Sequence, residues 1–223
     1  LGDLTILPGG TTTGTFSAWA RKNTSGISTS QEIIAKWNSV GTTYKEWRML
    51  WNFNSNIYFG TSPDNTTQIN LTGGETLSAN TWYNIVCTFH PTEKNKIYID
   101  GALDKTSGSA MSSGIDDGGN NIFIGKNGDG GASHFDGYIT DVAIWKDVAL
   151  DLATVQSIYN NGTPNDLTKT ASYTTGSGVD KSGDLVGYWR MNEGTGVTLK
   201  DSSVSGNNGT IDGAVYSTDV PPN

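Results

Sequence analysis

The sequence is poor in cysteine, and it lacks long apolar runs and a secretory signal. Cys87 is the only cysteine among 223 residues, so no disulfide can form within the chain, and we interpret Cys87 as a small core residue. No apolar stretch is long enough to cross a membrane, and no signal peptide is present. The chain begins with Leu1 instead of Met. We therefore expect a piece of a larger protein.

Basic residues are also scarce: the sequence has 14 Lys and Arg residues and 22 Asp and Glu residues. The formal net charge of −8 argues against nucleic acid as a partner, since phosphates need a basic surface. An acidic chain is compatible with calcium binding, but the same acidity also serves solubility alone.

Signatures of catalysis are missing as well. The only two histidines, His90 and His134, have no nucleophile motif beside them, and phosphate-loop, Rossmann and zinc-protease patterns are absent. Retaining glycoside hydrolysis needs two carboxylates about 5 Å apart. No expected strand carries two acids on one face; the glutamates are isolated, at Glu32, Glu46, Glu75, Glu93 and Glu193. We therefore predict that the chain is not an enzyme.

What the sequence does contain is typical of short strands joined by polar turns. Gly numbers 29, Thr, Ser and Asn are abundant, and seven Trp and nine Tyr can fill a core. The length suits one large all-β domain. Sequence patterns predict strands over residues 15–21, 31–37, 46–53, 57–60, 68–71 and 138–145, with a short edge strand near 4–7, and strands over 81–89, 96–99 and 121–125 are expected from the resemblance described below.

Residues 135–162 are the stretch around which the rest is organised. Both faces of its expected strand are largely apolar: Tyr138, Val142 and Ile144 share one face, and Ile139, Ala143 and Trp145 the other. Such a strand should lie inside a two-layer structure. Asp151 can then cap a short helix whose apolar residues are Leu152, Val155, Ile158 and Tyr159. Gly162 is expected to end the helix in the left-handed conformation.

Three blocks of this sequence resemble laminin-G-like and pentraxin-like domains. They are the segment from Gly137 to Gly162, the pair Thr81-Trp82-Tyr83-Asn84-Ile85-Val86-Cys87-Thr88-Phe89 with Lys96-Ile97-Tyr98-Ile99-Asp100-Gly101, and Asn121-Ile122-Phe123-Ile124-Gly125. The resemblance implies an all-β, concanavalin A-like jelly-roll sandwich of two antiparallel sheets, with one short helix near residues 151–161. It also implies core positions for Trp47, Met49, Trp51, Phe53, Trp82, Trp145 and Trp189.

Residues 184–216 resemble the opening segment of a laminin-G-like domain, although here they come last. They either close the same sandwich or begin a second, truncated domain. So short a segment cannot bury its own apolar face, which favours closure. We therefore predict one domain over residues 1–217, closed by 184–217, and a tail or linker over 218–223.

The resemblance also implies a structural calcium ion as cofactor. Its ligands would be Asp201, Asn207, Asn208 and, from the late strand, Asp141; Thr140 stands where many family members have another Asp. Asp-Ser-Ser and Asn-Gly sequences also form ordinary turns, so a plain turn is the alternative.

A second loop, residues 126–136, is similar to the pentraxin calcium loop. Asp129 matches one of its acids, Asn127 replaces a second, and no third is recognisable among residues 130–133. This favours a surface loop over a two-calcium site. Candidate ligand-binding residues near loops are Trp37, Tyr44, Tyr58, Asp129 and His134.

The resulting functional hypothesis is a non-catalytic recognition module that binds glycan or another surface ligand. We expect it to belong to a larger secreted or cell-surface protein, without membrane insertion. The alternative is a structural or decoration domain of a virion or extracellular filament, which contacts neighbouring subunits. A third possibility, a glycan hydrolase or lyase on the same fold, lacks the paired acids.

Overall fold

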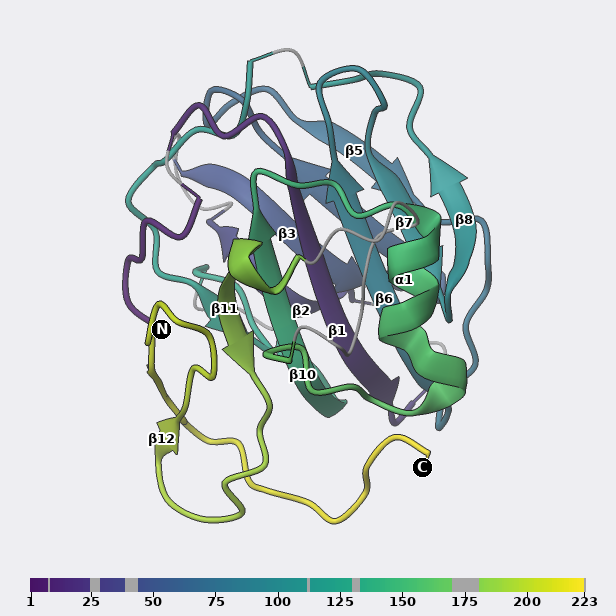
Figure 1. Ribbon diagram of the computed structural model, residues 1–223, viewed down its shortest axis with the longest axis vertical. Helices are drawn as coiled ribbons and strands as arrows, with labels where there is room; N and C mark the ends of the chain where they lie inside the picture. Colours follow the sequence, from purple (N-terminus) through teal and green to yellow (C-terminus); the bar gives the residue numbers. More distant parts are fainter. Residues whose placement is uncertain are drawn as a thin grey trace.

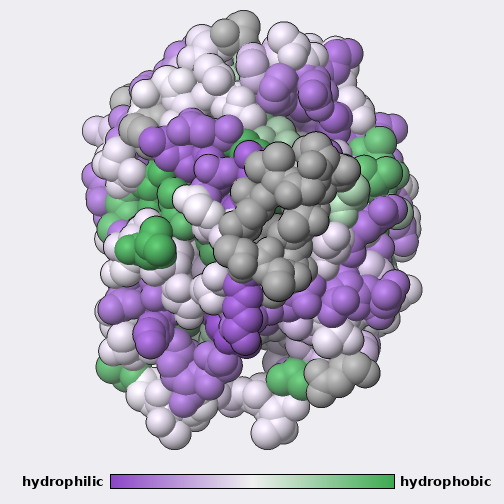
Figure 2. All heavy atoms as spheres, viewed as in Figure 1, coloured by the Kyte–Doolittle hydropathy of each residue, from purple (hydrophilic) through white to green (hydrophobic). Residues whose placement is uncertain are grey.

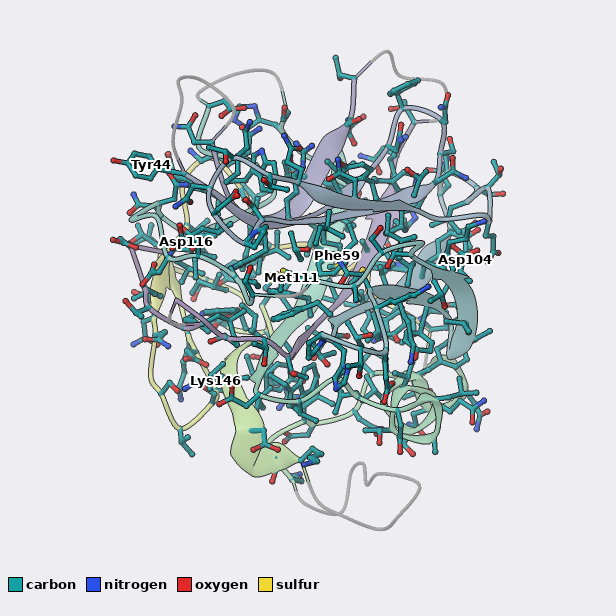
Figure 3. All side chains as sticks on the ribbon, turned by 90° about the horizontal axis from the view of Figure 1, so that it is seen from above. Tyr44, Phe59, Asp104, Met111, Asp116 and Lys146 are labelled. Carbon is teal, nitrogen blue, oxygen red and sulfur yellow. The ribbon has the colours of Figure 1, made fainter. Side chains whose placement is uncertain are left out.

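Alternating apolar residues build two antiparallel sheets that pack face to face, as the computed structural model shows (Figures 1 and 3). The structure describes residues 1–7, 9–24, 29–38, 44–111, 113–129, 133–169 and 181–222. The predicted all-β sandwich with two antiparallel sheets and one short helix is confirmed.

The larger sheet has six strands. Their spatial order is β11 (Leu185–Trp189), β10 (Gly137–Lys146), β1 (Gly14–Lys22), β6 (Trp82–Phe89), β7 (Lys96–Ile99) and β8 (Ala102–Thr106). The second sheet has five strands, in the order β5 (Ile69–Thr72), β4 (Ile57–Thr61), β3 (Lys45–Trp51), β2 (Gln31–Trp37) and β9 (Phe123–Ile124). A small separate pair joins β12 (Thr198–Leu199) to β13 (Gly209–Thr210).

The core between the two sheets is centred on Phe16 of β1. Its ring centroid lies 4.6 Å from that of Trp47, 5.6 Å from Phe59 and 6.1 Å from Phe89. In Figure 3, Phe59 and Met111 lie between the two layers. The expected core residues Trp47, Met49 and Trp51 belong to this cluster, and so does Cys87.

The six-stranded sheet also buries its outer face, which is covered by helix α1 (Leu152–Tyr159) (Figure 1). The outer cluster contains Trp145, Val155, Ile158 and Tyr188. Two short 3₁₀ segments, η1 (Asn160–Gly162) and η2 (Ser182–Asp184), flank the connection from the helix to β11.

The ends of α1 follow local capping rules. As predicted, Asp151 is the N-cap, and its carboxylate accepts a hydrogen bond from Thr154 N at 2.8 Å. The helix ends two residues earlier than expected, because Asn160 already adopts the left-handed conformation with φ of 47°. Asn tolerates this conformation, so Gly162, whose φ is 100°, lies beyond the helix end.

A bulge in β10 changes which side chains share a face. Ser17 pairs with Ala143 but Trp19 with Thr140, so β10 has one extra residue there, and Asp141 has φ of 50°. Because a strand alternates with period two, one extra residue exchanges the faces. The predicted grouping of Tyr138 with Val142 and Ile144 is therefore wrong. Ile139 packs against the inner core with Val142 and Ile144, whereas Ala143 and Trp145 belong to the outer cluster.

The N-terminal segment contributes to the core without forming a strand. Within the described residues 1–7 there is no β-structure, so the expected edge strand near 4–7 is wrong, although Ile6 and Leu7 are buried. An ion pair anchors the segment instead: the buried Lys36 Nζ lies 3.3 Å from Asp3 Oδ1 and 2.9 Å from Glu46 Oε2. Side chains, not a backbone ladder, hold this end of the chain.

The C-terminal segment packs onto the same sandwich. β11 pairs with β10 at the edge of the six-stranded sheet, and Trp189 and Leu199 enter the inner core. Trp189 Nε1 donates to the Asn207 carbonyl at 2.9 Å, which satisfies its buried polar atom. These contacts agree with closure by this segment, while the domain limits at residues 1 and 217 stay a prediction.

Replacing Trp189 with Ala should test whether this segment belongs to the cooperative unit. Loss of a fully buried Trp from a core costs about 3–5 kcal/mol of unfolding free energy. Urea denaturation followed by circular dichroism measures the change, and Val204→Ala, at a side chain 92 % exposed, is the control. A Trp189→Ala variant as stable as the control would mean that residues 185–210 are not integral to the sandwich.

Candidate functional site

In the part of the chain that the structure describes, the outer face of the five-stranded sheet has no helix over it, and it carries an open cleft of about 420 Å³. Strands β2, β3 and β4 form its floor, and the segments after β3 and β9 form parts of its wall. The lining residues that matter below are Glu32, Arg48, Phe53, Tyr58, Asn127 and Asp129.

Arg48 is the central cation of this cleft. Its guanidinium carbon lies 4.4 Å from the ring centroid of Trp37 and 5.0 Å from that of Tyr58. Arg48 Nη1 also lies 3.7 Å from Glu32 Oε1 on the neighbouring strand. Two rings and a carboxylate thus fix the orientation of the planar Arg48 guanidinium. Because the side chain is already ordered, it loses little conformational entropy when a ligand binds.

The loop after β9 brings amide and acidic groups to the same place. Gly125 N donates to Ile33 O and Gly128 N to Trp37 O, both at 2.9 Å, so the loop is tied to β2. Asn127 Nδ2 donates to Asp129 Oδ2 at 2.9 Å, and Asp129 N donates to Asn127 Oδ1 at 3.1 Å. The cleft therefore combines fixed donors and acceptors beside aromatic rings.

Glu32 is the most perturbed acid of the site. The pKa of its carboxyl is raised to about 7, mainly by burial and in part by the negative charge of Asp129, while Arg48 and a hydrogen bond from Asn127 oppose the shift. Within the described residues, neither Glu32 Oε2 nor Arg48 Nε has a hydrogen-bond partner, although both atoms are buried. Buried unpaired polar atoms are uncommon and are concentrated at functional sites.

The structure brings together only some of the predicted ligand-binding residues. Tyr58 and Asp129 line the cleft, and Trp37 lies beneath Arg48 with 1 % of its surface exposed. Tyr44 and His134 do not line it. Tyr44 points away from the core at the periphery (Figure 3), and its carbonyl accepts a hydrogen bond from Asn120 Nδ2.

Three residues of the cleft were not predicted. Glu32 and Arg48 are charged residues on strands that carry several other polar side chains, so polarity alone did not single them out; alternation with Trp47 and Met49 could have indicated that Arg48 faces outward. Phe53 was expected in the core, but it follows the end of β3 and is 50 % exposed on the cleft wall. That expectation was wrong because β3 ends at Trp51, after which alternation no longer holds.

The predicted calcium ligands lie elsewhere, around β11. Both oxygens of the buried Asp201 carboxylate are already occupied by protein donors. Oδ1 accepts from Tyr188 N and Ser203 N, both at 2.8 Å, and Oδ2 from Ser203 Oγ at 2.9 Å and Asn207 N at 2.7 Å. Asn208 Oδ1 in turn accepts from Asp201 N at 2.9 Å.

Asp141 contacts the side chain of Tyr188, whereas Asp201 contacts its backbone. The Tyr188 hydroxyl donates to Asp141 Oδ1 at 2.6 Å, whereas Asp201 holds the Tyr188 backbone nitrogen. Burial raises the pKa of Asp141 above its usual value, and raises that of the Tyr188 phenol. Calcium needs six to eight oxygens converging on one point, and these four residues in this arrangement do not fit an ion. Among the described residues, no three His, Cys, Asp or Glu side chains are grouped to hold a metal. The hydrogen bonds favour the plain turn, which was the alternative to the calcium ion expected from the sequence, and the melting experiment below tests between the two.

Besides Trp47 and Trp51, two further expected core tryptophans are confirmed and one is not. Trp145 and Trp189 are fully buried. Trp82 is only partly buried, and its indole Nε1 donates to Asp219 Oδ1 at 2.9 Å. Asp219 belongs to residues 218–223, which were predicted to be a tail or linker, and its carboxylate contacts Trp82 and Arg21 of the six-stranded sheet.

Comparison with known families agrees with this architecture. Residues 2–156 match a laminin G family described as the "Concanavalin A-like lectin/glucanases superfamily". The chain belongs to this superfamily. The predicted concanavalin A-like jelly roll is thereby confirmed. No curated protein matches the chain.

Solved structures share the concanavalin A-like fold at low sequence identity. A Bacteroides ovatus protein described as a "putative carbohydrate binding protein" is 15 % identical over 92 % of this chain and 56 % of its own, with a TM-score of 0.61. The heptameric SAP-like pentraxin of Limulus polyphemus is 12 % identical over 78 % of each chain, with a TM-score of 0.52.

A botulinum neurotoxin type C structure, whose description states that cell entry depends on two ganglioside molecules, is 18 % identical. The match covers 67 % of this chain and 35 % of the toxin chain, with a TM-score of 0.51. This chain thus spans about half of the Bacteroides protein and a third of the toxin structure. Among the described residues, no helix has the length and apolar character needed to span a membrane.

Glu32 should make the stability of this concanavalin A-like domain depend on pH. Its pKa is about 7 in the folded chain against 4.5 when unfolded, so between these values the folded state holds a proton that the unfolded state releases. The free energy of unfolding should therefore fall as pH rises from 4.5 to 7, by on the order of 3 kcal/mol. Urea denaturation from pH 4.5 to 8 should show a steeper fall in the wild type than in Glu32→Gln, which keeps a smaller fall because burial also raises the pKa of Glu46 to about 7. Glu75→Gln, at an exposed acid, should keep the wild-type profile; identical profiles for both variants would contradict the assignment.

The hydrogen bonds of Asp201 predict that calcium does not change the melting temperature. Wild-type curves in calcium and in chelator should coincide, and Asp201→Ala should lose roughly 3 kcal/mol or more in both, because charged hydrogen bonds are lost. Differential scanning calorimetry measures both effects, with Asp129→Ala as control. A calcium-dependent rise in the wild type that Asp201→Ala removes would establish the ion predicted from the sequence.

Proposed function

We propose that this domain is a non-catalytic recognition module that binds a saccharide in the cleft over β2, β3 and β4. The observation that carries the proposal is the guanidinium of Arg48, held between Trp37 and Tyr58 beside Glu32. A planar cation fixed in this way presents its donors in one orientation, and specific recognition of hydroxyl groups requires such fixed donors.

The remaining lining groups support a sugar as ligand. Asp129 and Asn127 supply acceptors and an amide, and Phe53 supplies an exposed ring on which a pyranose face can stack. The volume of about 420 Å³ falls within the usual range for small-molecule sites. Mixed polar and aromatic groups of this kind match the alternating hydroxyl and C–H faces of a saccharide.

Similar structures support the same class of function. The Bacteroides protein is described as binding carbohydrate and the toxin as interacting with gangliosides. We extend to this chain only the general role of binding a glycan or another surface ligand. Its residence outside the cell, in a larger protein, is part of the proposal.

Glycoside hydrolysis is the second candidate, because Glu32 and Asp129 are two acids in one cleft and Glu32 has the pKa of a general acid. Binding is favoured because the unpaired oxygen of Glu32 is buried, while its other oxygen faces Arg48. In that position Glu32 orients the cation and does not reach a glycosidic bond. Incubation of hit oligosaccharides with the protein should release no new reducing ends.

A glycan array followed by calorimetry with the best hit tests the proposal. Arg48→Lys keeps the charge but loses the planar stack, so the affinity should fall at least tenfold, which is about 1.4 kcal/mol. The matched control is Arg190→Lys, since Arg190 pairs with Asp166 outside the cleft and its replacement should leave binding unchanged.

Two outcomes would overturn this function. An absence of glycan hits together with self-assembly in sedimentation would favour the alternative of a subunit-contacting structural domain. Hits that bind Arg48→Lys as tightly as the wild type would mean that the saccharide binds somewhere else.

A further inference from the structure

Three side chains form a row across the opposite, outer face of the six-stranded sheet. In the strand register, Arg21 of β1 pairs with Tyr138 of β10 on one side and with Trp82 of β6 on the other. The guanidinium carbon of Arg21 lies 5.1 Å from the ring centroid of Tyr138, and the rings of Trp82 and Tyr138 are 6.2 Å apart. We call Tyr138, Arg21 and Trp82 the arginine–tryptophan row.

A carboxylate of the same chain occupies this row. Asp219 Oδ2 lies 3.0 Å from Arg21 Nη1, and Asp219 Oδ1 accepts from Trp82 Nε1 at 2.9 Å. In Figure 1 the C-terminal residues pass below the lower end of α1, beyond the part of this face that the helix covers. Each carboxylate oxygen therefore has its own donor from a different strand.

The chemistry of the row is that of a carboxylate receptor. A guanidinium and an indole N–H provide two donors spaced for the two oxygens of one carboxylate, and neither donor can act as an acceptor. Arg21 Nη2 also donates to Asn80 Oδ1 at 3.2 Å, which holds the guanidinium in place. The partly exposed indole beside these donors offers a ring face for stacking.

We propose that the arginine–tryptophan row is a second binding site, for a saccharide that carries a carboxylate, and that Asp219 occupies it when no ligand is bound. The three side chains lie on adjacent strands about 4.8 Å apart, so the length of the row matches one or two sugar rings. A protein interface would cover a far larger surface than these three side chains offer. On this side of the molecule, the coloured residues of Figure 2 show apolar side chains in small separate groups, which also fits a small polar ligand.

Displacement of Asp219 is feasible because its own side chain is exposed. The side chain of Asp219 is 38 % exposed and that of Arg21 is 18 % exposed, and ion pairs with an exposed partner contribute little to stability. A tethered carboxylate nevertheless competes at a high effective concentration, so it weakens the binding of a free acidic sugar. Asp219 is thus an internal competitor.

Calorimetry with trigalacturonate, and with galactotriose as its uncharged counterpart, tests the proposal. Asp219→Asn keeps an acceptor for the indole but cannot pair with Arg21, so it should bind trigalacturonate about tenfold more tightly than the wild type. Asp212→Asn removes the same charge at an exposed position outside the row and should behave like the wild type. Arg21→Gln in the Asp219→Asn background should abolish the gain.

A second readout locates the ligand. In ¹⁵N-labelled Asp219→Asn protein, trigalacturonate should shift the indole N–H resonance of Trp82, which Trp82→Phe assigns. Equal affinity of the Asp219→Asn and Asp212→Asn variants for trigalacturonate would contradict the proposal, because the contact of Asp219 with Arg21 and Trp82 would then be structural only. Equal binding of galactotriose would refute carboxylate recognition, and a gain that Arg48→Lys abolishes would move the ligand to the cleft. The cleft residues take no part in the row, so the two proposals fail independently.

Discussion

The constraint on which this structure depends is that the six-stranded sheet is apolar on both faces. Phe16 and its neighbours on the inner face need the five-stranded sheet, while Trp145 and Val86 on the outer face need α1 and the segment that follows it. Burial of large aromatic side chains on two sides supplies most of the favourable free energy in such a domain. The position of the other segments follows from which of these two faces each one covers.

The candidate sites occur where this covering stops. Among the described residues, the five-stranded sheet is covered by the other sheet on its inner face, and on its outer face the polar side chains of β2, β3 and β4 line a cleft. On the outer face of the larger sheet, α1 covers the centre, and Trp19 stacks on Tyr159 at 5.9 Å. Beyond that contact the carboxylate of Asp219 lies over the arginine–tryptophan row. Function is therefore proposed at two boundaries of the core, not inside it.

Much of the fold could be predicted from the sequence, because alternation and capping are local. The cap at Asp151 and the strand from 82 to 89 depend on neighbouring residues, and both were found. The exchange of faces in β10 could not be predicted, because the bulge at Asp141 arises from pairing with β1, which is more than a hundred residues away. Phe53 was misplaced for a related reason: the sequence pattern does not reveal that the strand ends at Trp51.

The candidate sites were less predictable than the fold. Tyr58 and Asp129 were selected as ligand residues, but the tie of the 125–128 loop to β2, which brings Asp129 to Glu32, is a long-range contact. The role of Arg48 depends on two rings from β2 and β4, which only the register assembles. Trp82 was assigned to the core because family resemblance does not distinguish a core ring from a ring at the uncovered end of a strand.

The order of strands in the chain has a consequence for its synthesis. β10 ends at Lys146 and its edge partner β11 begins at Leu185, about 40 residues later. At ribosomal rates of roughly 5–20 residues per second, the outer edge of β10 lacks its partner for about 2–8 s after β10 itself has been made. During that interval the place of Trp189 in the core is vacant and an unpaired strand edge is exposed. The nascent chain is therefore vulnerable to aggregation between the synthesis of β10 and that of β11, after most of the core residues of this domain have already emerged.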